Sequence, residues 1–298
     1  MRIAETLRRL IGPVELIHEQ AGPRLLRLTQ LGIFALWILK LSLDPLWRLS
    51  ELPKEMIRPV GVLNLLSPGA LDQLMRPGAL CVFLIATIVV AMLAALHRWF
   101  LLTSTLAAIL LTVYSSIIRS FGPAVHTDIV LLLAVYALAG FAWADFFAPK
   151  ARGRYAYPLI TIVALLCLSY CIVGLNRVIS GGMGVFAGET MEAWAIDASL
   201  RGYYFNTNIG WHIPEWPVAL FFLQSGLPVI TLFEILAPLC LVMPRFRWVF
   251  IPVMISFHLL SLVFMNIFFF DDMFCYLLLV DWSRRFQALA KEKKLRNY

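Results

Sequence analysis

Charged residues are scarce in this chain. Asp, Glu, Lys and Arg make up 14% of its 298 residues, whereas 61% of the residues are hydrophobic. A soluble domain has roughly 25% charged and 45–50% apolar residues. The composition therefore leaves almost no sequence for a soluble domain, and it predicts an integral membrane protein that crosses the bilayer several times.

Sequence motifs of common catalytic sites are also missing. The chain has no Gly-rich phosphate loop, G-x-S-x-G, H-E-x-x-H or C-x-x-C motif. All five cysteines lie in apolar runs without ligand-like spacing, so we expect them to be packing residues and predict no metal site: Cys81, Cys167, Cys171, Cys240 and Cys275. The first twenty residues lack the apolar core of a secretory signal, so we expect no cleaved signal peptide.

Apolar runs long enough to cross a membrane dominate the rest. A crossing helix needs about 20 such residues. Eight segments are candidates: 25–43, 78–96, 99–118, 129–147, 155–175, 218–243, 248–265 and the shorter 268–282. We predict an all-α polytopic bundle of about eight transmembrane helices over residues 25–282, within a single domain 1–298. The two long connections, 44–77 and 176–217, contain amphipathic pieces that we expect either to lie in the outer interface or to dip in as caps over the bundle.

The distribution of basic residues predicts the orientation. The net charge of +7 arises in short loops, in the amphipathic N-terminal segment 1–24 and in the tail 283–298. Positive residues favour the cytoplasmic side, so we predict an inner (plasma) membrane protein with both termini in the cytoplasm. The same distribution gives no indication of nucleic-acid binding.

Two ionisable residues lie inside predicted crossings, Glu234 in 218–243 and His258 in 248–265. Such a residue costs roughly 2.5–3.5 kcal/mol at the bilayer centre, so it normally has a partner or a function. Counting residues from the inner helix ends places both at roughly 14–15 Å depth, where they could meet. The pair is either a proton relay or polar pocket, or a structural brace between the two helices.

A second polar group is expected at the outer helix ends. It comprises His126, Thr127, Asp128, Asn176, Arg177, Asp271 and Asp272. An outward-facing cleft with these side chains would suit an anionic or polar ligand. The alternative is a solvated rim in which Thr127 or Asp128 caps a helix.

Several segments resemble one protein family in their amino-acid sequence and in their order along the chain. They read ELPKEMIRPVGVL, VHTDIVLLL, SYCIVGLNRV, FEILAPLCLVMPRFR, SFHLLSLVF and MFCYLLLVDW. The set resembles the HTTM domain, which is the membrane portion of vitamin K-dependent gamma-carboxylase and of many bacterial proteins. The resemblance covers nearly the whole chain and implies a lyase-like scaffold that uses a reduced quinone such as vitamin K as cofactor.

The resemblance also implies site residues. The family's catalytic lysine would fall in the motif that here reads Gly174, Leu175, Asn176, Arg177. Arginine stays charged in proteins and is a poor general base, so carboxylation itself does not follow from the resemblance. His126 and His258 match family histidines, and Glu234 matches an acidic position. The implied catalytic residues are therefore His126, Arg177, Glu234 and His258, and the implied cofactor contacts are His126, Asn176 and Arg177.

Three functional hypotheses remain open. The first is an HTTM-type membrane protein that binds a quinone-like or lipid ligand in an outward-facing pocket, with a peptide or protein substrate at the outer face if it is an enzyme. The second is a non-catalytic accessory protein for peptide maturation or export, which the missing lysine favours. The third, a small transporter, is ranked last because no repeat symmetry is evident.

Overall fold

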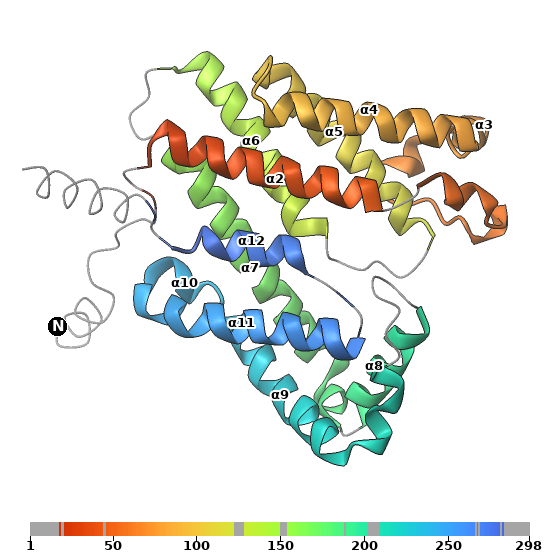
Figure 1. The fold of residues 1–298 in the computed structure, drawn as a ribbon, viewed down its shortest axis with the longest axis vertical. Coiled ribbons are helices and arrows are strands. Elements are labelled where there is room, and N and C mark those ends of the chain that lie inside the picture. Colours follow the sequence, from red (N-terminus) through yellow and green to blue (C-terminus); the bar gives the residue numbers. More distant parts are fainter. Residues whose placement is uncertain are drawn as a thin grey trace, which may run out of the picture. The chain divides into compact units, whose positions relative to one another are not determined.

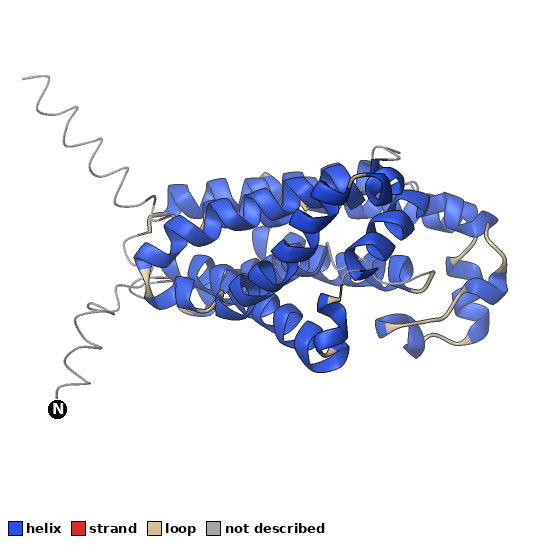
Figure 2. Cartoon of the chain, turned by 90° about the horizontal axis from the view of Figure 1, so that it is seen from below, coloured by secondary structure: helices blue, strands red, loops and turns tan. Residues whose placement is uncertain are grey.

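The computed structural model describes residues 18, 21–43, 46–121, 128–149, 154–187, 189–201, 209–265, 267, 269–280 and 282, without the side chains of Lys54, Leu200 and Arg201. These residues are helical or lie in turns and loops, and no strand occurs among them (Figure 2). The predicted all-α class is confirmed. The chain is an integral membrane helical protein.

Seven helices of the described residues are long and apolar enough to cross a membrane. They are α2 (Pro23–Leu43), α4 (Pro77–Ala95), α5 (Phe100–Arg119), α6 (Ile129–Phe147), α7 (Ala156–Gly181), α9 (Pro217–Leu236) and α11 (Pro244–Met265) (Figure 1). Shorter elements connect them: η1 (Leu46–Glu51), η2 (Lys54–Met56), η3 (Gly61–Leu65), α3 (Pro68–Leu74), η5 (Met183–Phe186), α8 (Glu189–Arg201), η6 (Ile209–Glu215), α10 (Leu239–Val242) and α12 (Phe270–Leu277).

The expected continuous helix over 218–243 is wrong in one respect. The helix ends at Leu236, and the four-residue α10 follows after a turn at Ala237 and Pro238. Proline has no backbone N–H and its ring clashes with the preceding helical turn, so a break at this position has a direct steric cause. Pro228 lies inside α9 without ending it.

The expected eighth crossing is shorter than predicted within the described residues. Its helix α12 has eight residues, which extend about 12 Å, against a hydrocarbon core of about 30 Å. Seven candidate crossings among the described residues are consistent with a polytopic bundle of about eight helices, and the eighth crossing itself stays a prediction. The orientation of the termini relied on the eighth crossing and stays a prediction.

Contacts divide the chain into two compact units. The first contains Gln20–Ile162 and the second contains Val163–Asp281, so that α7 begins in one unit and ends in the other. Each is described by itself below. The prediction of a single domain over 1–298 stays a prediction.

The first unit is held together by aromatic and apolar packing among α2, α4, α5 and α6. Trp37 is fully buried, lies edge-on to Tyr114 at 5.9 Å and donates its indole N–H to the Leu131 carbonyl at 3.4 Å. Asp128 precedes α6 and accepts hydrogen bonds from Arg119 at 2.7 Å and from Ser115. It therefore belongs to an internal polar contact between α5 and α6.

A tight turn joins α4 to α5 and contains His97, which adopts a positive φ of 58°. The imidazole Nδ1 lies 3.0 Å from Oε1 of Gln30, and its ring stacks on Phe100 with 4.4 Å between centroids. Partial burial and the nearby positive charge of Arg27 lower the pKa of His97 below its usual 6.5, against a smaller opposite effect of Asp145. His97 is therefore neutral in the folded chain at pH values where the unfolded chain is already protonated.

Folding stability should thus decrease as the pH falls from 6.5 towards the lower pKa of the folded state, because the unfolded state binds more protons in that window. The substitution His97→Gln should reduce this pH dependence, since it removes the titrating group. Thermal unfolding of both proteins between pH 7.5 and 5 tests this expectation. Equal slopes in the two proteins would contradict it.

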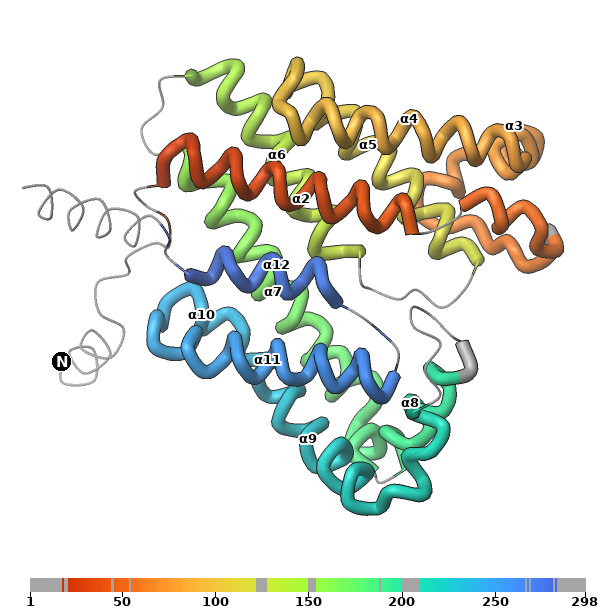
Figure 3. The backbone as a smooth tube through the Cα atoms, viewed as in Figure 1, coloured from red at the N-terminus to blue at the C-terminus, as the bar shows by residue number. Residues whose placement is uncertain are grey.

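In the second unit the chain runs through α8 and η6 into α9, turns at α10 and returns as α11 (Figure 3). Gln224 of α9 donates to the carbonyls of Phe186 at 2.8 Å and Ala187 at 2.5 Å, and accepts from the backbone N–H of Met191. These contacts connect α9 to η5 and α8. The predicted outer segment 176–217 therefore contains helices that pack on the bundle.

Candidate functional site

Helix α7 presents a polar stripe within the second unit. Tyr170, Gly174 and Arg177 are spaced four and three residues apart, which puts them on one face of a helix. Tyr170 and Gly174 are buried, and the side chain of Arg177 is 14% exposed. Two groups of polar residues contact this stripe, one at Arg177 and the other at Tyr170.

Arg177 forms a two-pronged ion pair with Glu234 of α9. Its Nη1 lies 2.5 Å from Oε2, and its Nη2 lies 3.2 Å from Oε1. Nη1 also donates to the Thr231 hydroxyl at 2.8 Å, which donates onward to the Leu227 carbonyl at 2.8 Å. Because Thr231 and Glu234 are three residues apart, they share the face of α9 that meets Arg177. The guanidinium and carboxylate charges neutralise each other inside the bundle.

Gly174 allows α7 and α9 to approach closely beside this pair. A Cβ atom at Gly174 would lie 2.9 Å from Cβ of Glu234 and 3.0 Å from the backbone nitrogen of Ile235. These distances are shorter than the contacts that Cβ atoms normally make, so any side chain at this position would push the two helices apart. Small residues permit this kind of close helix packing in membranes, so Gly174 sets the separation at which Arg177 reaches Glu234.

The other polar group surrounds His258 of α11. Its Nε2 lies 2.8 Å from the Tyr170 hydroxyl and 2.7 Å from the Tyr276 hydroxyl. Tyr170 donates to Oδ2 of Asp272 at 2.9 Å, and the two tyrosine hydroxyls are hydrogen-bonded to each other. We call Tyr170, His258, Asp272 and Tyr276 the tyrosine–histidine cluster. Its members come from α7, α11 and α12.

All four cluster residues are buried, with at most 7% of their surface exposed, and Glu234 is 2% exposed. Hydrogen bonds and charge interactions are stronger in such low-dielectric surroundings than in water. Ionisable groups inside a membrane-spanning bundle usually either carry a function or fix the helix arrangement. The geometry permits both here, because every one of these residues contacts another helix.

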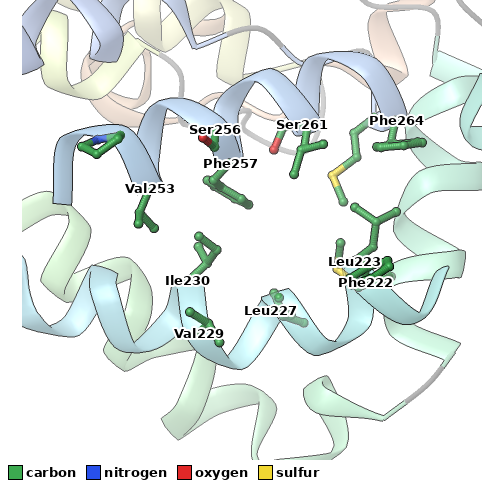
Figure 4. A pocket seen from close by; sticks show the side chains of 15 residues that line it. Phe222, Leu223, Leu227, Val229, Ile230, Val253, Ser256, Phe257, Ser261 and Phe264 are labelled. Atoms are coloured by element: carbon green, nitrogen blue, oxygen red, sulfur yellow. The ribbon is translucent and has the colours of Figure 1, made fainter. Parts of the chain in front are cut away.

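An apolar cavity of about 410 Å³ lies between α9 and α11. The two helices form its opposite walls, as Figure 4 shows, with Leu227 and Ile230 on α9 facing Phe257 and Phe264 on α11. The hydroxyls of Ser256 and Ser261 are the polar side-chain groups of the lining, and no charged residue belongs to it. The size is within the range of about 300–1,000 Å³ typical of small-molecule sites.

The site residues predicted from the sequence do not form the contacts that were expected. Glu234 and His258 do not form the expected contact, because Glu234 pairs with Arg177 whereas His258 bonds to two tyrosines. Asn176 is exposed and accepts a hydrogen bond from Ser180, so it does not join Arg177 at the ion pair. His126 lies outside the described residues.

Three aspartates of the second polar group, Asp128, Asp271 and Asp272, are buried, so they do not belong to the solvated rim that was the alternative interpretation. Asp271 and Asp272 are buried, at 0% and 6% exposure. Asp128 is occupied by Ser115 and Arg119, and Thr127 lies outside the described residues. Among the residues that the structure describes, no group of three or more His, Cys, Asp or Glu side chains could hold a metal ion, and the cysteines are free.

Sequence reasoning missed Tyr170, Thr231 and Tyr276. Each lies within an apolar run and reads there as an ordinary membrane-embedded residue. The spacing of Tyr170 and Arg177, seven residues apart on one helix face, was the available signal. It becomes informative only when the helices that face α7 are known.

Comparison with known proteins finds no matching family model, no matching curated protein and no matching solved structure. The resemblance to the HTTM family therefore remains a prediction that rests on the sequence segments quoted above.

Proposed function

We propose that this chain is an HTTM-type membrane protein that binds an uncharged lipid of the isoprenoid-quinone class in the cavity between α9 and α11. The observation that carries the proposal is the composition of the cavity wall, which is apolar except for the hydroxyls of Ser256 and Ser261. Burying a charged headgroup without a partner is very costly, so this wall favours a neutral ligand. The two hydroxyls can hydrogen-bond to a carbonyl or hydroxyl of its head.

The position of the cavity also supports a lipid ligand. Three apolar lining side chains remain well exposed on the chain's surface: Phe222 at 68%, Val229 at 50% and Leu260 at 46%. In a membrane these side chains would face acyl chains, from which an isoprenoid tail can enter sideways. In the predicted topology the cavity lies in the outer half of the bilayer, as the outward-facing pocket of the hypothesis requires.

Filling the cavity tests the proposal. Gly226 lines the cavity, and a Cβ atom added there would meet nothing within 4 Å, so Gly226→Phe should place a ring inside without displacing backbone. We expect at least a tenfold loss of a stoichiometric co-purified quinone or isoprenoid, measured by native mass spectrometry and lipid extraction. Gly140→Phe is the matched control, because Gly140 also has open space but lies on α6. Equal ligand retention in the two variants would reject the cavity as the site.

A second function is favoured by a separate observation. Arg177 and Glu234 satisfy each other through two hydrogen bonds, so the residue that stands where the family has its lysine is already occupied. This arrangement supports a structural brace in a non-catalytic accessory protein for peptide maturation or export. Bulk phospholipid alone in the mass spectra of the wild-type protein would favour this alternative.

A further inference from the structure

The tyrosine–histidine cluster contains four close contacts between oxygen or nitrogen atoms, and each contact needs a proton between its two atoms, either its own or one shared with a second contact. They join Tyr170 to Asp272, Tyr170 to Tyr276, and His258 Nε2 to each tyrosine hydroxyl. An ionised carboxylate only accepts, and each phenol supplies one proton. The one proton of Tyr170 is therefore used towards Asp272, and the Tyr170 oxygen must accept from its other neighbours.

The tautomer of His258 decides whether the remaining contacts are satisfied. If Nε2 is unprotonated, the Tyr276 hydroxyl is the remaining donor for the three contacts among Nε2 and the two tyrosine oxygens. It can donate to one of them, and in the other two the lone pairs of two acceptor atoms face each other. If Nε2 carries the proton, it is shared between the Tyr170 and Tyr276 oxygens at 2.8 and 2.7 Å, and Tyr276 donates to Tyr170. All four contacts then contain a proton. Closely facing buried lone pairs are costly, so the geometry favours the second arrangement.

We infer that His258 is protonated on Nε2 and that its bare Nδ1 is the accepting end of an internal proton relay that leads to Asp272. Nδ1 is buried and has no hydrogen-bond partner among the residues that the structure describes. A basic nitrogen left in this state inside a bundle is able to accept a proton from a neutral hydroxyl placed beside it. This inference concerns the cluster alone and does not require the lipid proposed above.

The transfer involves protons only. The O–H bond of the donor breaks and an N–H bond forms at Nδ1. The Nε2 proton passes to Tyr276, the Tyr276 proton passes to Tyr170, and the Tyr170 proton passes to Asp272. The donor is left as an anion, and Asp272 ends as a neutral acid that can donate back to Tyr170. The heavy atoms keep their positions, because His258 and Tyr276, and likewise Tyr170 and Asp272, already lie at hydrogen-bonding distance and the two tyrosine hydroxyls are already hydrogen-bonded to each other.

The ring environment suits such a relay. The His258 ring lies 4.6 Å from the ring of Phe269 and 5.2 Å from that of Phe257, and it stacks on Tyr276 at an angle of 18°. These aromatic neighbours fix the imidazole plane and hinder water from reaching the cluster. Protons are then confined to the hydrogen-bonded path towards Asp272.

Nitrogen NMR of the wild-type protein tests the tautomer directly. The full chain is labelled with ¹⁵N-histidine in lipid nanodiscs, and His258 is assigned by the signals that disappear in His258→Gln. At neutral pH we expect a protonated Nε2 and an unprotonated Nδ1 for His258. A protonated Nδ1 with a bare Nε2 would overturn the inference, as would a doubly protonated ring.

The variant Asp272→Asn tests whether Asp272 determines the tautomer of His258 at the other end of the relay. The amide cannot accept the relayed proton, and its NH₂ group can donate to Tyr170, which reverses the direction of the hydrogen bonds. We expect the His258 proton to move to Nδ1 in this variant. Tyr136→Phe is the control, because it removes the Tyr136–Thr112 hydrogen bond of the first unit and should leave His258 unchanged. An unchanged tautomer in a folded Asp272→Asn protein would overturn the relay, and the wild-type spectrum decides the case if this variant does not fold.

Discussion

Replacing Arg177 by methionine is expected to lower the free energy of unfolding by about 3–5 kcal/mol, because it leaves the Glu234 carboxylate buried without its partner. Glu234 is 2% exposed, and both its oxygens are bonded to Arg177. Denaturant titration in detergent micelles, followed by tryptophan fluorescence, measures the change.

Removing both charges distinguishes the cost of an unpaired buried charge from the contribution of the ion pair itself to stability. The double variant Arg177→Met/Glu234→Leu should recover most of the lost stability, since replacing a buried ion pair by apolar residues is often neutral or stabilising. Arg154→Met is the matched control. Arg154 pairs with Asp145 at 2.8 Å, but the two side chains are 27% and 38% exposed. We expect a loss of about 0–1 kcal/mol there.

The result also bears on function. If Arg177 and Glu234 are only a brace, the double variant should fold and retain any bound lipid. If it folds as stably as the wild type but loses a co-purified ligand, the pair takes part in binding. A single Arg177→Met variant that is as stable as wild type would show that Glu234 finds another partner or a proton, which the geometry of the pair does not predict.

Hydropathy was sufficient to locate the candidate crossing helices, because the thickness of the bilayer sets the length of apolar run that a crossing helix needs. Seven of the expected segments became helices with ends within about four residues of prediction, except at Pro238 and at the end of α7, which continues to Gly181 instead of ending at 175. The short run at 268–282 was the weakest candidate, and α12 has eight residues. Local composition does not determine whether such a run crosses the bilayer, because its length depends on how its neighbours pack.

The partners of the buried polar residues were not predictable in the same way. The rise per residue gives a depth, and it placed Glu234 and His258 at similar levels. Depth does not specify which face of a helix meets which neighbour. Glu234 turns to α7 and meets Arg177, whereas His258 meets Tyr170 and Tyr276. That choice follows from the close approach at Gly174 and from the position of α12, which are both tertiary features.

Gly174 is therefore the position at which a small change should have a large effect. Gly174→Val is expected to cost about 3 kcal/mol or more, because overpacking a tight interface typically costs about 1–3 kcal/mol and the displaced helix also loosens a buried ion pair. The added atoms would lie against the Glu234 Cβ and the Ile235 backbone, which has no rotamer to relieve the clash. Gly140→Val is the control, since a Cβ atom added at Gly140 on α6 would meet nothing within 4 Å, and it should change stability by less than about 1 kcal/mol.

A double-mutant cycle distinguishes the two sources of this cost. In the background of Arg177→Met/Glu234→Leu no ion pair remains to be loosened, so Gly174→Val should cost less there than in the wild-type protein, with an interaction energy of about 0.5–3 kcal/mol. Steric cost alone would be equal in both backgrounds. A coupled result would show that Gly174 acts by holding α7 at the distance where Arg177 reaches Glu234, and an additive result would confine its role to packing against Ile235.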